Sequence, residues 1–225
     1  MNKVIDFIDD AGNQLIDEYV LPMVKGTKKI IADENLAIKS LLTFRSTLIE
    51  HKISKFIDYM KNYEDDIVGF IQNLNNKEKK YFIETINKVM DLDDSFQVYL
   101  LSVLLNKFNT NGSLNYWEKS IYYNIKSFSE DDFLILFRFM NFLSKPIQHK
   151  VNYGIPQDSK DELIICIKKF ESVGIISLYS GTFQAECVNL KLKEQYRIAF
   201  SFYPFIDELF EVIKNYTIND KYNSI

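Results

Sequence analysis

The segment SKDELIICIKKFESVGIISLYSG, residues 159–181, predicts the organisation of the C-terminal part of the chain. Ser159 stands three residues before Glu162, which is the spacing of a capping box at the start of a helix. Gly174 is a residue that commonly ends a helix, and β-branched and aromatic residues follow it. The helix between them is expected to turn a set of apolar side chains inward, namely Leu163, Ile164, Ile167 and Phe170. The stretch therefore predicts a helix that leads directly into a strand.

Two extended runs flank Gly181, which predicts a β-hairpin, and Pro204 stands at the start of a last helix. A helix, a hairpin and a closing helix in this order resemble a winged-helix module. We expect this module to occupy residues 158–216. A polar tail, 217–225, follows it and is expected to be flexible.

Helix-breaking residues are scarce before the module. From residue 27 to residue 145 there is no proline, and Gly69 and Gly112 are the only glycines. Apolar residues recur there at spacings of three and four, behind polar residues suited to helix starts. We expect a helical bundle over residues 1–145. The predicted fold class is mainly α: a multi-helix bundle followed by a winged-helix-like α+β module with a β-hairpin.

The segment NKFNTNGSLNYWE, residues 106–118, imitates a calcium loop. With Gly112 at the sixth position of an EF-hand, Asn109, Asn111 and Glu118 fall on ligand positions. Lys107 then occupies the first position, where an oxygen ligand is required. We interpret the segment as a helix end followed by a capped helix start, and we expect neither a metal site nor a cofactor.

Clusters of acids occur at residues 64–66, 91–94 and 130–132. Each cluster precedes or opens a predicted helix, where a carboxylate interacts favourably with the backbone dipole. We therefore interpret these acids as helix caps and not as catalytic pairs.

The composition indicates a cytoplasmic protein. The formal net charge is −4, which gives no overall bias toward nucleic acid, and the two cysteines, Cys166 and Cys187, have no metal-site spacing. No apolar stretch reaches the roughly 20 residues that a membrane span requires. We expect reduced cysteines and no membrane span.

Arg45 and His51 match the loose Arg-x(4–6)-His pattern of HEPN ribonucleases, which are also helical. The resemblance implies that the arginine steadies a phosphate and the histidine assists transfer from the ribose hydroxyl. Ser46 stands where an Asn or Asp usually follows the arginine. On one straight helix the two side chains lie about 120° apart. A HEPN-like ribonuclease or toxin is the enzymatic alternative.

A small basic surface is the alternative that points to DNA. It would comprise Lys168, Lys169, Lys191, Lys193 and Arg197. From residue 145 onward nine lysines and one arginine face ten acids, so the module lacks the basic excess that phosphate binding favours. A winged-helix transcriptional regulator remains an alternative on these residues.

The layout as a whole resembles bacterial abortive-infection alpha proteins, which are associated with phage and mobile elements. The likeness lies in a segment HKISKFIDYMKN at residue 51, the helical middle from residue 79 to residue 140, and the end ELIICIKKFESVGIISLYSG. It implies phage defence or mobile-element biology and carries no catalytic residues. The leading hypothesis is a non-catalytic adaptor that binds a protein partner or a second copy of itself.

Overall fold

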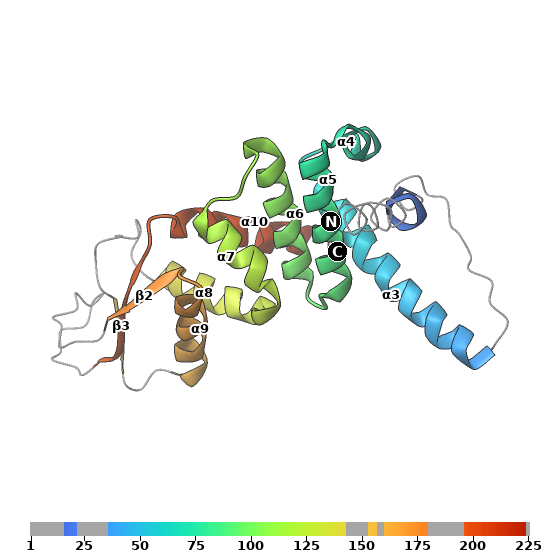
Figure 1. The fold of residues 1–225 in the computed structure, drawn as a ribbon. Coiled ribbons are helices and arrows are strands. Elements are labelled where there is room, and N and C mark those ends of the chain that lie inside the picture. Colours follow the sequence, from blue (N-terminus) through green and yellow to red (C-terminus); the bar gives the residue numbers. More distant parts are fainter. Residues whose placement is uncertain (1–15, 22–35, 143–152, 157–159, 180–195, 224–225) are drawn as a thin grey trace, which may run out of the picture. The chain divides into compact units, whose positions relative to one another are not determined.

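A computed structural model describes residues 16–21, 36–142, 153–156, 160–179 and 196–223 (Figure 1). In these residues the fold is mainly helical, with eight α-helices and one three-stranded antiparallel sheet. The chain divides into two compact units, residues 1–114 and 115–225.

The first unit is built around one helix, α6 (Ser95–Asn111), that is buried on all sides over most of its length. Its elements are η1 (Ile16–Val20), α3 (Leu36–Met60), α4 (Ile67–Asn73), α5 (Asn76–Asp91) and α6 (Ser95–Asn111). Every side chain from Phe96 to Leu105 on α6 is buried, which is the pattern of a central helix. Helices α3 and α5 pack against α6 and against each other. On α3 the residues Ile53, Phe56 and Met60, which recur at the spacings of three and four that predicted a helix, are buried.

Short polar side chains start the helices of this unit, as the sequence predicted. Asn75 and Glu78 form a complete capping box at α5, with both bonds between 2.9 and 3.0 Å long. The Asp94 carboxylate accepts from the first N–H groups of α6, and the Asp66 carboxylate accepts from Gly69 N–H at 2.9 Å in α4. Each bond gives a partner to an N–H group that has none within its own helix.

The second unit combines helices with the sheet. Its elements are α7 (Tyr116–Asn124), η2 (Ile125–Ser127), α8 (Glu130–Phe142), β1 (Tyr153–Pro156), α9 (Asp161–Ser172), β2 (Ile176–Tyr179), β3 (Tyr196–Phe202) and α10 (Ile206–Asn223). Helix α8 packs against α9 and α10, and α9 packs against β2. Aromatic rings fill the space between α8 and α9, where Phe170 lies 4.9 Å from Phe128 and 5.4 Å from Phe133, measured between ring centroids.

The sheet has the order β1-β3-β2, and both of its pairs are antiparallel. The predicted pair of strands after the helix is present as β2 and β3. Residues 180–195 between them, including Gly181, lie outside the described residues. Strand β1 was not predicted. Its register with β3 is irregular at Pro156, which lacks the N–H group that a regular ladder needs.

The segment that imitates a calcium loop is a helix end followed by a helix start. Gly112 takes the left-handed conformation (φ 70°), and its N–H donates to Phe108 O at 2.8 Å. Asn115 N–H donates to Glu118 Oε2 at 2.8 Å, and Glu118 N–H donates to Asn115 Oδ1 at 3.1 Å. The capping interpretation of Gly112, Asn115 and Glu118 is therefore confirmed.

Several boundaries differ from the expected ones. Helix α9 begins at Asp161 behind Lys160, which makes no side-chain cap, and Ser159 lies outside the described residues. Helix α10 continues to Asn223, and within it Tyr216 is buried and donates to Glu130 Oε2 at 3.3 Å. Residues 217–223 are thus helical where a flexible tail was predicted. The second compact unit begins at Asn115, whereas the predicted boundary near 145–158 falls largely outside the described residues.

Within the described ranges, no helix combines the length and the apolar character that crossing a bilayer demands.

The Glu118 capping box gives a test of the calcium question. We expect Glu118→Ala to lower the free energy of unfolding by about 1–2 kcal/mol, because Asn115 N–H loses its acceptor. Glu118→Gln should cost less, since a glutamine carbonyl oxygen can accept the same bond. Urea denaturation with and without millimolar Ca²⁺ measures both effects. A calcium-dependent rise in the unfolding midpoint that either substitution abolishes would contradict the capping role.

Candidate functional site

The outward face of α9 is the candidate site, because it is the solvent face of the helix that leads into the β2–β3 pair. The exposed residues on it are Asp161, Glu162, Ile165, Lys168, Glu171 and Ser172. Ile165 is 55% exposed in the middle of this polar set. We refer to these six residues as the α9 face. Three acids and one lysine give it a net charge of −2.

The opposite side of α9 fixes its orientation. Ile164, Ile167 and Phe170 are buried as predicted, and the fully buried Cys166 donates its S–H to Asp132 O at 3.2 Å. Burial raises the pKa of the Cys166 thiol to about 12, and the neighbouring Asp132 carboxylate acts in the same direction. A thiol held in this way is a packing and hydrogen-bonding group and not a nucleophile.

A buried carboxylate binds one of the two α9 lysines of the predicted basic surface. Asp132 Oδ2 accepts from Ser129 N–H at 2.8 Å and from Ser129 Oγ–H at 3.0 Å, as the predicted helix start of α8 requires. It also accepts from Lys169 Nζ at 2.7 Å. Because Asp132 is buried, this pair is better shielded from solvent than a surface pair. Lys169 therefore serves the contact between α8 and α9.

The remaining predicted DNA-binding residues do not form a described surface. Lys168 is exposed on α9. Lys191 and Lys193 lie outside the described residues, and Arg197 lies in β3, where its side chain is not among those described. Of the five predicted residues, the structure therefore describes the side chains of Lys168 and Lys169, and Lys169 forms an ion pair with Asp132.

The two candidate catalytic residues of a ribonuclease both lie on α3. His51 is exposed, and the side chain of Arg45 is outside those described. Six positions on a single helix separate their directions by about 120°, so one copy of α3 does not turn both toward the same side.

Exposed tyrosines on α7 were missed at the sequence level. Tyr116 is 72% exposed and Tyr123 is 66% exposed, one helical heptad apart. A Cβ atom at Gly174 would lie 3.0 Å from the Tyr116 hydroxyl oxygen, and Ser120 Oγ–H donates to Val173 O. The α7 face that carries Tyr116 and Ser120 therefore borders the end of α9. The exposure of Ile165 was also not predicted. Residues 163–167 are all apolar and cannot all face inward on one helix, but the run itself does not show which of them is exposed.

No known protein-family profile, curated protein or solved structure matches this chain.

The raised pKa of Cys166 predicts its reactivity. In a Cys187→Ser variant we expect a disulfide reagent at pH 8 to label Cys166 only after unfolding, because the thiolate is the reactive form. The folded state favours the neutral thiol, so its contribution to stability is full below the unfolded pKa of about 8.5. That contribution is lost as pH rises toward the folded pKa. Denaturation between pH 7 and pH 10 should therefore show a decline that Cys166→Ala lessens. Native labelling at the rate of a free cysteine would contradict this environment.

Proposed function

We propose that this chain is a non-catalytic binding protein that docks a protein partner on the α9 face and the adjoining Tyr116 of α7. The partner it fits has an apolar side chain or shallow pocket opposite Ile165 and a basic rim opposite the acids. The observation that carries the proposal is the exposed Ile165 in the centre of a face with a net charge of −2.

A winged-helix-like architecture for residues 158–216 is part of the proposal. It is supported by the order of β1, α9, β2 and β3 along the chain and by the central position of β3 in the sheet. Helix α9 directly precedes the paired strands β2 and β3. In DNA-binding helix-turn-helix domains a helix enters the major groove and reads the bases. The chemistry of the α9 face decides which kind of partner such a helix would meet here.

That chemistry favours protein over DNA. Phosphate contacts from lysine and arginine supply much of the affinity of DNA-binding proteins. The α9 face offers Lys168 against three carboxylates, and Lys169 is engaged by Asp132. An apolar centre with a charged rim, by contrast, is the usual anatomy of a protein interface. Tyrosines such as Tyr116 and Tyr123 are enriched in such interfaces because they combine a large apolar area with a polar end.

The cellular setting is proposed from the resemblance to abortive-infection alpha proteins. In that setting the protein is a cytoplasmic bacterial adaptor in phage defence or mobile-element biology. The binding surface described here is consistent with an adaptor, whose action requires no reacting groups. Arg45 and His51 would need a second copy of α3 to complete a ribonuclease site, so the enzymatic alternative is not favoured.

The decisive experiment compares two substitutions that introduce the same charge. Ile165→Asp lies in the α9 face, and Ile218→Asp lies on α10 at a similar exposure of 45%. Native mass measurement of affinity-purified protein should show one protein partner at fixed stoichiometry with the unaltered chain. We expect Ile165→Asp to weaken that complex at least tenfold, as loss of a central interface residue does, and Ile218→Asp to retain it.

Duplex DNA supplies the opposing measurement. We expect no salt-dependent binding of a duplex at near-physiological ionic strength, because the α9 face repels phosphate. Duplex binding that Lys168→Ala weakens would reject the protein-partner proposal in favour of a regulator. A mass of two chains that Ile165→Asp reduces to one would identify the partner as a second copy.

A further inference from the structure

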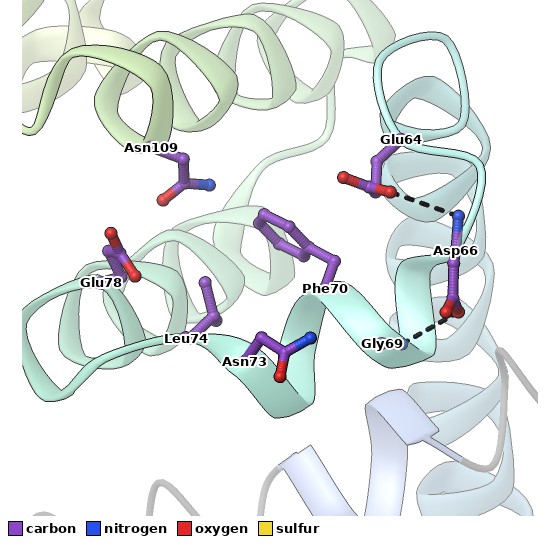
Figure 2. A pocket seen from close by; sticks show the side chains of 8 residues that line it. All are labelled: Glu64, Asp66, Gly69, Phe70, Asn73, Leu74, Glu78 and Asn109. Atoms are coloured by element: carbon purple, nitrogen blue, oxygen red, sulfur yellow. Dashed lines mark hydrogen bonds between the residues drawn. The ribbon is translucent and has the colours of Figure 1, made fainter.

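A cleft of about 400 Å³ lies in the first unit, between the start of α4, the start of α5 and the end of α6 (Figure 2). Its size is at the lower end of the range for small-molecule sites. Figure 2 shows Glu78 and Asn109 at one end and Glu64 and Asp66 at the other, with the Phe70 ring between them.

Each of the three carboxylates keeps one oxygen that no described group occupies. Glu78 Oε2 accepts from Asn75 N–H at 2.9 Å, Glu64 Oε1 accepts from Asp66 N–H at 3.3 Å, and Asp66 Oδ1 accepts from Gly69 N–H at 2.9 Å. Among the described residues, no lysine or arginine forms an ion pair with any of the three. The cleft thus carries a formal charge of −3 that is not balanced from within the described part of the unit.

The second observation is the amide of Asn109. Both of its polar atoms expose less than 1 Å² and have no hydrogen-bond partner in the described structure. Figure 2 shows this amide directed into the cleft, above Glu78 and Leu74. A buried polar group without a partner costs about 1–3 kcal/mol. A ligand that donates a hydrogen bond to Asn109 Oδ1 would remove part of that cost.

These features define the class of ligand. Three carboxylates disfavour anionic ligands, and the Asn109 amide can accept a hydrogen bond from a cation through Oδ1. Within the described ranges no group of three or more His, Cys, Asp or Glu side chains is arranged to hold a metal ion, which favours an extended cation over a compact one. The Phe70 ring between the two acidic ends suits a methylene stem and a cation beside an aromatic face. We propose that this cleft binds a small linear organic diamine or polyamine, with one ammonium group toward Glu78 and Asn109 and the other toward Glu64 and Asp66.

Gly69 fixes the position of the Asp66 carboxylate at the Glu64 and Asp66 end of the cleft. A Cβ atom at this position would lie 2.3 Å from Asp66 Oδ2, so any larger residue displaces that carboxylate. The capping bond from Gly69 N–H and the absence of a side chain at position 69 together hold the second Asp66 oxygen in place. Gly69→Ala should therefore weaken diamine binding without changing the charge of the cleft.

Isothermal titration of the full chain with putrescine tests the proposal, and 1,4-butanediol serves as an uncharged ligand of the same length. We expect one saturable putrescine site at low ionic strength and none for the diol. Asp66→Asn keeps the helix cap, because asparagine caps as well as aspartate, and should weaken binding about three- to tenfold. Asp65→Asn makes the same charge change at an exposed position that does not line the cleft, and should change affinity less than twofold.

Asn109→Leu tests the contribution of the amide to binding without changing the charge of the cleft. This variant should fold with at least the original stability, because it removes a buried polar group without a partner, and it should weaken putrescine binding about tenfold. Unchanged binding in Asn109→Leu would overturn the proposal. Equal losses in Asp65→Asn and Asp66→Asn, which indicate diffuse attraction to an acidic surface, would also overturn it. So would binding of Mg²⁺ in preference to putrescine.

Discussion

The structure depends on one constraint: the first N–H groups of a helix have no partner inside that helix. Here the partner is supplied within three residues, by Asp66, Asn75, Asp94, Asn115 and Ser129 with Asp132. Because each bond is local, a short stretch of sequence specifies where each of these helices begins. Aromatic and aliphatic side chains then pack the helices within each unit.

A carboxylate that caps a helix can still form other interactions. A carboxylate has two oxygens and several lone pairs, and a helix start uses only part of them. Asp132 shows this within the second unit, since it serves the start of α8 and also holds Lys169. The same reasoning applies to Glu64, Asp66 and Glu78, whose second oxygens border the cleft of the first unit. One carboxylate can therefore cap a helix with one oxygen and bind a ligand with the other.

The starts of α4 to α8, the apolar face of α9, and the paired strands β2 and β3 could be predicted, because each depends on spacing within a short segment. Strand β1 could not, since four residues ending in a proline form a strand only when β3 is beside them. The exposure of Ile165 is likewise decided by where α8 and β2 pack on α9. The cleft is lined by residues from α4, α5 and α6, and no pattern within a short segment of sequence predicts that these helices lie next to one another. A candidate residue chosen by its type alone can already be engaged in the folded protein. Lys169, for example, forms an ion pair with Asp132, which only the tertiary structure reveals.

The central strand of the sheet has a consequence for synthesis on the ribosome. Strand β3 pairs on one side with β1, where Tyr153 faces Phe200, and on the other side with β2. Both outer strands are translated first and have no partner until β3 emerges, whereas the first unit is by then complete in sequence. The nascent second unit therefore spends its last stage of elongation with two unpaired edges and an apolar helix face uncovered, and this is the interval in which a chaperone would be of most use to it.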